Sequence, residues 1–455
     1  MSRYPGRYPG ETLRRRLLFG LLAALCLAAP AGAATGRAGG EPLAGQEWWL
    51  SHIGADQVAP PGPGVPLTII DSGIDATHPE FAGRPDTTYL NDQTVNGGEE
   101  FHGTTVASIA AAPANGAGLL GVYPQAVLQS IDASPAGTVL DFVAIAAIQT
   151  AAQHCPAVIN ISFGSVRRNP ALADAILTAV HQGCLVVAAS GNSGEQGSPT
   201  TYPAAYPHVL TVGATDQSDR VAGFSTTSPG LDLVAPGVDI VGAVPLWRDP
   251  SGYRDKLAGT SFAAPIVSAA AAWVWTARPS LDVTQLASVL RSSARDIGAP
   301  GFDSASGYGL LNIPAALTAP VPPPDPYEPN DDVVQVQPAR LFALGEPWLT
   351  TSAKASTRIS ARLEDTDDPH DLYRIWVPAH QVVRAAVVSG GSDATARIWG
   401  PQTNSIDEPL DQRRRDLKGQ LVRGGKKGFM AYVDVLLTGR SRTASYVLSV
   451  TAARR

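Results

Sequence analysis

The chain has 455 residues, of which 44% are hydrophobic and 16% are charged, and its formal net charge is −6. This composition excludes a largely disordered protein, and the length allows more than one domain. Residues 1–33 carry five arginines and one glutamate, so the rest of the chain has a net charge of −10. We therefore expect no nucleic-acid partner, because nucleic-acid binding requires a basic surface.

The N-terminus is typical of a secretory signal peptide. Arg14, Arg15 and Arg16 precede an apolar run from Leu17 to Ala29 that is too short to span a bilayer. Small residues at 31–33 then offer a cleavage site. We predict a signal peptide over residues 1–33 and a secreted, extracellular protein that has no membrane anchor after cleavage.

The first apolar run after the signal, Leu67–Ile70, ends at Asp71 and a turn. A continuous apolar run of this kind suits a parallel strand that is covered on both faces, and such sheets carry functional residues at the carboxyl ends of their strands. His102 follows at the start of a predicted helix of small residues, Gly103–Ala111. Taken alone, Asp71 also fits a turn cap and His102 a solvated side chain.

The middle of the chain alternates between strand and helix patterns over Val158–Ser162, Pro170–His181 and Leu185–Ser190. This alternation predicts a parallel sheet with right-handed crossovers. Asn192 follows the second of these strands, where its amide could donate a hydrogen bond to an oxyanion or serve only the turn.

Cys155 and Cys184 each stand just before one of these two strands, and neighbouring strands could bring them together. An oxidising compartment favours disulfides. We predict a disulfide, with two buried thiols as the alternative.

The segment Gly259–Pro265 runs into an apolar stretch, Ile266–Trp275, which predicts a helix buried around its whole circumference. Ser261 would lie at the N-terminal end of this helix, where free N–H groups and the helix dipole favour negative charge. Pro265 is acceptable there if it belongs to the first turn, which needs no backbone donor. Ser261 fits either a nucleophile or a helix cap, and a nucleophilic serine needs a base that a third group orients.

Asp71, His102, Asn192 and Ser261 stand in separate stretches, and the sequence around them resembles the subtilisin family of serine peptidases. The resemblance covers about residues 41–318 and includes the chain order of these residues. The matching stretches are Asp71–Asp75 with His78–Glu80, His102–Thr104, Asn115–Pro124, Ala189–Asn192, Val234–Gly237 and Gly259–Ser261.

The resemblance implies an α/β domain of three layers around a parallel sheet, and it implies a role for each site residue. Ser261 would be the nucleophile, His102 the base, Asp71 the residue that orients His102, and Asn192 an oxyanion donor. The family also implies that substrate lies beside Ser162, Phe163 and Gly164, with Gly191 lining the specificity pocket.

The resemblance further implies a structural calcium site at Glu80 and Asn115, although no cofactor is required for the chemistry. A solvated glutamate and a turn asparagine remain the alternative. Thr105 and Phe262 depart from the residues that usually follow the histidine and serine motifs, but both are packing positions.

A proline-rich stretch, 319–330, predicts a stiff linker between two domains. The domains would then be a short extension over 34–40, the α/β domain over 41–318 and a small all-β sandwich over 331–455, which resembles the C-terminal domain of many secreted bacterial peptidases. Asp365, Asp367, Asp368 and Asp371 fit either a charged turn or a calcium site, and Arg413–Arg415 fit a solvated loop.

The sequence therefore predicts a monomeric, secreted serine endopeptidase that acts on proteins or peptides through an acyl-enzyme. The alternative is a catalytically weak protein of the same fold that binds peptides. Acyl transfer to an amine would use the same residues as hydrolysis.

Overall fold

The computed structural model describes residues 40–91, 101–134, 137–325, 327–342, 348–390, 393–406, 417–439 and 441–454. The predicted signal peptide and the residues Arg413–Arg415 lie outside these ranges. All described residues belong to one compact unit, Gly36–Arg455.

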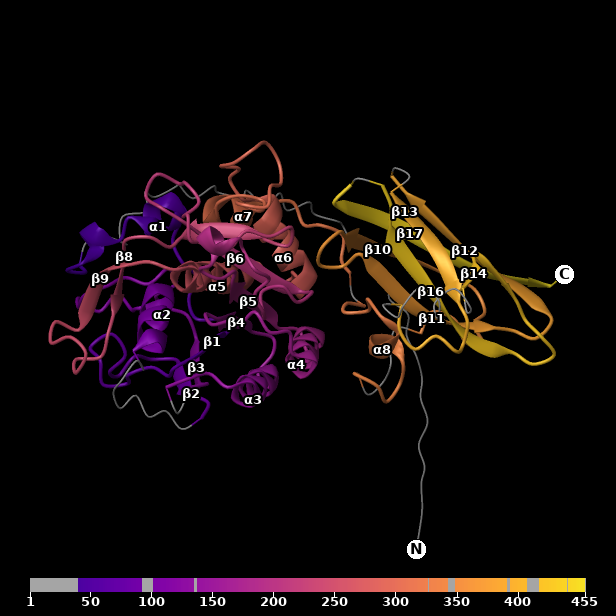
Figure 1. The fold of residues 1–455 in the computed structure, drawn as a ribbon, viewed down its shortest axis with the longest axis horizontal. Helices are drawn as coiled ribbons and strands as arrows, with labels where there is room; N and C mark the ends of the chain where they lie inside the picture. Colours follow the sequence, from indigo (N-terminus) through magenta and orange to yellow (C-terminus); the bar gives the residue numbers. More distant parts are fainter. Residues whose placement is uncertain are drawn as a thin grey trace, which may run out of the picture. The chain divides into compact units, whose positions relative to one another are not determined.

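A parallel sheet of seven strands forms the centre of the first domain (Figure 1). Its strand order is β2-β3-β1-β4-β5-β6-β7, and every pairing between neighbours is parallel. The strands are β1 (Leu67–Asp71), β2 (Thr87–Tyr89), β3 (Leu128–Asp132), β4 (Val158–Ile161), β5 (Leu185–Ala189), β6 (Val209–Thr215) and β7 (Leu233–Pro236). The predicted parallel sheet is confirmed.

Helices cover both faces of this sheet, and the sheet separates two hydrophobic cores. In β5, Leu185 and Val187 pack on one face with α2 (His102–Ala111) and α5 (Thr260–Ala277). Val186 and Ala188 point to the other face, where α3 (Asp141–Ala152) and α4 (Pro170–His181) lie. Because successive strand residues point to opposite faces, a fully apolar strand supplies both cores. This gives the three predicted layers.

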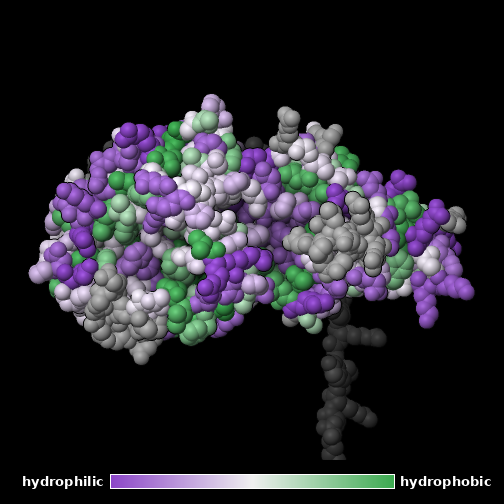
Figure 2. Space-filling view, in the orientation of Figure 1, coloured by the Kyte–Doolittle hydropathy of each residue, from purple (hydrophilic) through white to green (hydrophobic). Residues whose placement is uncertain are grey.

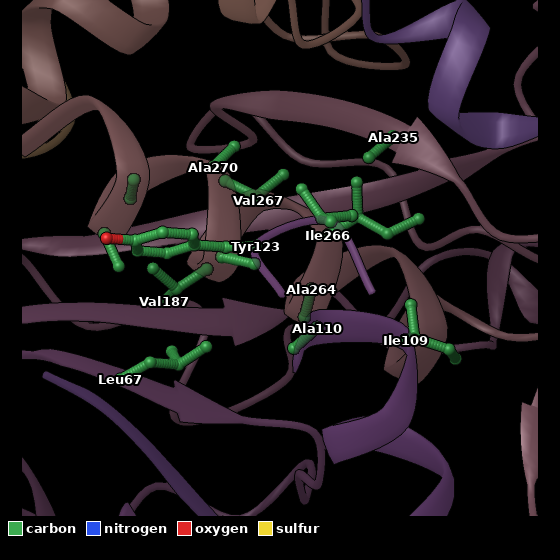
Figure 3. Close-up of a cluster of buried hydrophobic side chains, with 14 of the residues drawn as sticks. Leu67, Ile109, Ala110, Tyr123, Val187, Ala235, Ala264, Ile266, Val267 and Ala270 are labelled. Atoms are coloured by element: carbon green, nitrogen blue, oxygen red, sulfur yellow. The ribbon is translucent and has the colours of Figure 1, made fainter. Parts of the chain in front are cut away.

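The helix α5 runs through the first core, as its apolar sequence predicts. Figure 3 shows Ala264, Ile266 and Val267 of this helix near Tyr123 and Val187. Among the described residues, α5 is the one helix long and apolar enough to cross a membrane, and 83% of it is buried inside the protein. Its hydrophobicity is therefore accounted for by the protein core.

Cys155 and Cys184 form the predicted disulfide on the α3–α4 side of the sheet. Shorter elements complete the α/β domain. The remaining elements are η1 (Ala44–Gln46), α1 (Trp49–His52), η2 (Ala55–Gln57), η3 (Gly194–Gln196), β8 (Ile240–Ala243), β9 (Tyr253–Leu257), α6 (Val283–Ser292) and α7 (Ile313–Thr318). On the face shown in Figure 2, hydrophobic residues lie in separate patches among polar ones.

After the short helix α8 (Val333–Val336), the C-terminal part forms two antiparallel sheets of four strands that enclose a core of their own. The first sheet has the order β10-β17-β12-β15 and the second β11-β16-β13-β14. The strands are β10 (Thr357–Glu364), β11 (His370–Val377), β12 (Gln381–Ser389), β13 (Ala394–Trp399), β14 (Leu417–Gly419), β15 (Leu421–Arg423), β16 (Phe429–Leu437) and β17 (Thr443–Arg454). The predicted β-sandwich is confirmed.

A buried arginine of the α/β domain contacts the turn between β10 and β11. Arg291 on α6 forms an ion pair with Asp232 of its own domain, with 2.7 Å between Nε and Oδ1. It forms a second ion pair with Asp367 of the turn, with 2.7 Å between Nη2 and Oδ2. The backbone N–H of His208 also donates to Asp367. Removing one partner from such a buried network leaves an unpaired charge, which is strongly unfavourable. These contacts therefore fix the position of the turn.

Candidate active site

The end of β1 and the start of α2 place Asp71 beside His102. His102 Nδ1 lies 2.8 Å from Asp71 Oδ1 and 3.0 Å from Oδ2. The backbone N–H of Ser72 donates to Asp71 Oδ1 at 2.8 Å, and the side chain of Asp71 is buried. Gly103 allows this approach, since a Cβ on it would lie 2.2 Å from the carbonyl oxygen of Gly73.

Asp71 also sets the protonation behaviour of His102. Burial lowers the pKa of the imidazole, but the charge of Asp71 and its hydrogen bond outweigh burial, so the pKa of His102 is raised above its usual 6.5. Asp71 favours the imidazolium for the same reason. His102 can thus hold a proton that it receives at Nε2 while Nδ1 stays bonded to the carboxylate.

Ser261 lies in the first turn of α5, as the sequence predicts, and it is bonded to the end of β4. Its hydroxyl donates to the carbonyl oxygen of Ser162 at 2.9 Å, and the Ser162 hydroxyl donates to the carbonyl oxygen of Ser261 at 3.0 Å. The prediction that Pro265 belongs to the first turn is wrong. The helix begins at Thr260, so Pro265 lies inside it and cannot donate to the Ser261 carbonyl. The Ser162 hydroxyl supplies the missing donor.

Ser261 is not hydrogen-bonded to His102, although the next residue, Phe262, contacts the His102 ring. Within the described ranges, no hydrogen bond joins their side chains, because the Ser261 hydroxyl is turned toward Ser162. The ring of Phe262, the residue after Ser261, lies 5.7 Å from the His102 ring, centroid to centroid. A rotation of the Ser261 side chain away from Ser162 is therefore the movement that a Ser261–His102 hydrogen bond requires.

Thr260 orients the amide of Asn192. The Thr260 N–H donates to Asn192 Oδ1 at 2.9 Å, and the Thr260 hydroxyl donates to the same oxygen at 3.0 Å. Two donors on the oxygen leave the Nδ2 group of Asn192 as the end that faces a ligand. Sequence reasoning missed this role of Thr260, although its place directly before Ser261 was a usable signal.

All four predicted substrate-binding residues, Ser162, Phe163, Gly164 and Gly191, line one cleft of about 770 Å³ with Ser261 and Asn192. Thr201 narrows it. A Cβ on Gly164 would lie 2.8 Å from Thr201 Cγ2, and a Cβ on Gly191 would lie 2.8 Å from Thr201 Oγ1. The two glycines are thus the residues that keep this part of the cleft open.

Glu80 and Asn115, the residues of the predicted calcium site, each use one side-chain oxygen to accept hydrogen bonds from the protein. Glu80 Oε1 accepts hydrogen bonds from the Leu119 N–H at 2.8 Å and from the Tyr253 hydroxyl at 2.9 Å. Asn115 Oδ1 accepts from the Ala117 N–H at 2.8 Å. These donors occupy oxygen atoms that a calcium ion would need. Glu80 Oε2 is buried and has no hydrogen-bond partner within the described residues. Calcium at this position remains a prediction.

Burial raises the pKa of Glu80 to about 7, and the charge of Glu41 acts in the same direction. The two hydrogen bonds from Leu119 and Tyr253 act against that shift. Without a bound cation, burial therefore favours the protonated form of Glu80 near neutral pH.

Comparison with known proteins identifies the α/β domain. A family profile described as "Subtilase family" matches residues 62–309. The chain is 36% identical over 260 residues to subtilisin DY from Bacillus licheniformis, which covers 56% of this chain and 91% of that protein. It is 33% identical to fervidolysin from Fervidobacterium pennivorans, over 63% of this chain and 46% of that protein.

Solved structures share the fold. The subtilisin-like protease Apa1 from Pseudoalteromonas sp. AS-11 has a TM-score of 0.52 and 20% sequence identity, over 61% of this chain and 97% of that chain. A lanthipeptide protease has a TM-score of 0.52 and 24% identity, over 60% of this chain and 94% of that one.

Proposed function

The chain belongs to the subtilase family and is a subtilisin-like serine endopeptidase, and we propose that Ser261, His102, Asp71 and Asn192 carry its chemistry through an acyl-enzyme intermediate. The observation that supports this proposal best is the Asp71–His102 contact at 2.8 Å beside a cleft lined by Ser261 and Asn192. A protein that only binds peptides has no use for this combination.

In the first step, the Ser261 hydroxyl leaves the Ser162 carbonyl and donates to His102 Nε2. As Ser261 Oγ attacks the substrate carbonyl carbon, His102 takes the hydroxyl proton and becomes an imidazolium. Asp71 keeps the other ring nitrogen bonded and stabilises the positive charge. Asp71 thereby lowers the barrier without taking up the proton.

The negative charge on the former carbonyl oxygen needs donors in place before it forms. Asn192 Nδ2 and the backbone N–H of Ser261 supply them, and the start of α5 adds the favourable end of the helix dipole. When the intermediate collapses, His102 donates its proton to the leaving amine and an ester forms on Ser261. A water molecule then repeats the attack on the ester, and His102 again acts as base.

Substrate would lie extended along Ser162–Gly164 and pair with the backbone there. The Thr201 side chain and the glycines Gly164 and Gly191 shape the adjoining pocket. The partners implied are protein or peptide substrates. The proposed chemistry uses groups of the protein itself and requires no cofactor.

We also propose that the protein is secreted and acts outside the cell as a monomer. The apolar run after three arginines at the N-terminus and the disulfide between Cys155 and Cys184 support secretion.

The proposal is tested by labelling the secreted protein with a fluorophosphonate, which reacts with activated serines, and by profiling cleavage of a peptide library. We expect labelling and cleavage of the wild type, and neither for Ser261→Ala. The thermal unfolding midpoint of Ser261→Ala should match the wild type, so that loss of folding is not the cause. A folded wild type without Ser261-dependent labelling would favour the weak peptide-binding alternative.

A further inference from the structure

The turn between β10 and β11 of the β-sandwich lies against the residues that narrow the substrate cleft. Thr366 of this turn lines a hollow of about 720 Å³ together with Thr200 and Thr201 of the α/β domain. Thr201 also lines the substrate cleft, where its side chain approaches Gly164 and Gly191. Thr201 is therefore shared by the cleft and by a hollow that the β-sandwich helps to line.

Backbone hydrogen bonds join Thr201 and its neighbours to the proposed substrate-binding residues. We call residues 200–211 the pocket segment. Within it, the Ala205 N–H donates to the Thr201 carbonyl oxygen at 2.9 Å. Tyr202 exchanges two backbone bonds with Ser165, at 2.7 and 2.8 Å, and Ser165 directly follows Gly164. A displacement of the pocket segment would therefore change the shape of the cleft.

A continuous path of hydrogen bonds and ion pairs leads from Asp367 of the turn into the pocket segment. Asp367 pairs with Arg291, and Arg291 pairs with Asp232. The second oxygen of Asp232 accepts from the Thr211 N–H at 2.6 Å, and the Thr211 hydroxyl donates to the Ala204 carbonyl oxygen at 2.5 Å. Since Arg291, Asp232 and Thr211 are buried, these polar bonds hold the groups in one arrangement.

His208, inside the pocket segment, is held by residues beyond the linker. Its backbone N–H donates to Asp367, and its Nε2 pairs with Asp331 Oδ2 at 2.9 Å. His208 has a φ of 61°, in the left-handed region that is unfavourable for a residue other than glycine. Such a conformation persists where the surrounding structure holds it. Asp367 therefore contributes to the backbone conformation of the pocket segment.

The β-sandwich also contacts the other side of the specificity pocket. Arg442, just before β17, donates through Nη2 to the Pro229 carbonyl oxygen at 3.3 Å. Three residues before Pro229, the Thr226 N–H donates to the Gly191 carbonyl oxygen at 2.9 Å. The Thr226 hydroxyl accepts from the Ser193 N–H at 3.1 Å. Contacts from the β-sandwich thus reach both stretches of chain that surround Gly191.

We propose that Asp367 is a positioning residue of the peptidase, and that through Asp367 the β-sandwich sets the affinity and the side-chain preference of the substrate cleft. Asp367 acts on the cleft through His208 and Arg291, which hold the pocket segment. The path does not include Ser261, His102 or Asp71, so the reactivity of the serine should not depend on it. This inference rests on the proposed function, because it concerns the same cleft.

The test uses the full chain and two N-acylated tetrapeptide p-nitroanilides that end in alanine or in phenylalanine. Asp367→Asn removes the charge that pairs with Arg291. We expect KM to rise roughly 2- to 30-fold, the range that substitutions in coupled networks produce. The ratio of kcat/KM for the two substrates should move toward one, because a loosened pocket discriminates less.

Fluorophosphonate labelling of Ser261 separates positioning of the pocket from damage to the chemistry. The probe is small and does not fill the pocket, so its labelling rate in Asp367→Asn should stay within about twofold of the wild type. Equal losses in labelling rate and in kcat/KM would overturn the inference, because they would show general damage to the site.

The matched control is Asp434→Asn, which removes a buried charge inside the β-sandwich. Asp434 pairs with His370 at 2.9 Å and accepts from Trp399 Nε1 at 3.0 Å, and all three residues belong to the sandwich. Both variants should lower Tm, but Asp434→Asn should keep the wild-type KM and the wild-type substrate ratio. An Asp367→Asn enzyme that behaves like Asp434→Asn would overturn the inference and leave the proposed function intact.

Two further measurements do not depend on the folding of Asp367→Asn alone. Arg442→Gln removes the bond to Pro229 while Asp367 keeps its partners, and it should also raise KM. In a double-mutant cycle, the effects of Asp367→Asn and Thr201→Ala on KM should be non-additive, because both act on the pocket segment. Additive effects, or a wild-type KM in Arg442→Gln, would contradict the inference. A wild type that is not labelled at Ser261 would contradict the proposed function and this inference with it.

Discussion

Ser162 and Ser261 exchange two hydrogen bonds, in which each hydroxyl donates to the other residue's carbonyl oxygen. The bond from Ser162 replaces the donor that Pro265 cannot supply inside α5. The bond from Ser261 turns the hydroxyl of the proposed nucleophile toward Ser162. Behind them, Asn160 Nδ2 donates to Ser162 Oγ at 3.0 Å, and the Ser268 hydroxyl donates to Asn160 Oδ1 at 2.9 Å. The start of α5 is thus tied to β4 through a chain of side chains.

Ser162→Ala should therefore reduce both stability and turnover. It leaves the Ser261 carbonyl without a donor, and a buried unsatisfied group costs about 1–3 kcal/mol. If about half of that free energy appears as misplacement of Ser261 in the transition state, kcat/KM falls roughly 2- to 12-fold. The measurement is kcat/KM together with urea unfolding. Ser51→Ala removes a similar hydroxyl-to-carbonyl bond at an exposed position and should change neither. A Ser162→Ala enzyme that matches Ser51→Ala would contradict the role of this bond.

Asn192→Ala should lower kcat by about 10²–10³-fold, because one prepared donor to the oxyanion is lost. KM should change little, since the charge exists only after attack has begun. Steady-state kinetics on a peptide substrate measure both parameters. Asn169→Ala, which removes the N-cap of α4, should cost about 1 kcal/mol of stability and leave kcat unchanged. Equal kcat values for these two variants would show that Asn192 does not donate to the oxyanion.

The sequence predicted the parallel sheet, the buried helix and the β-sandwich because their residue patterns are governed by burial, which a single sequence expresses directly. It also predicted that Asp71 would meet His102, since the resemblance supplied the pairing. It could not predict contacts between distant residues with ordinary neighbours. The Tyr253 hydroxyl, on β9, donates a hydrogen bond to Glu80. The sequence around neither residue predicts this contact. Likewise, Asp325 joins Asp368 and Asp371 only through the path of the linker.

The rate of peptide hydrolysis should fall on the acid side with a midpoint above pH 6.5. His102 must be neutral to take the Ser261 proton, and Asp71 raises the pKa of His102 above that usual value despite burial. As pH falls through this raised pKa, the base is lost and kcat/KM declines with it. A pH profile of kcat/KM, together with the rate of fluorophosphonate labelling, locates the midpoint. A midpoint below pH 6.5 in both measurements would show that Asp71 does not outweigh the effect of burial on His102.

The stability of Glu80→Gln relative to wild type should increase as pH rises. This pH dependence distinguishes a buried carboxyl group from a calcium ligand. Burial raises the pKa of Glu80 to about 7 from its usual 4.5, so the folded state binds the proton more tightly than the unfolded state. The contribution of Glu80 to wild-type stability is thus fully present below pH 4.5 and is lost as pH rises through about 7. Glutamine does not titrate, so the variant avoids this loss.

The free energy of unfolding of Glu80→Gln minus that of wild type, measured in chelator, should therefore increase between pH 4.5 and pH 7 and level off above. One pKa unit corresponds to about 1.36 kcal/mol, and since the carboxyl is not wholly shielded from water we expect an increase of about 1–3 kcal/mol. Glutamine can still accept the bonds from Leu119 and Tyr253, so any constant offset cancels in the comparison across pH. If Glu80 instead binds calcium, the substitution will lower Tm in Ca²⁺ but not in chelator, and the increase with pH will disappear when the pH series is repeated in Ca²⁺.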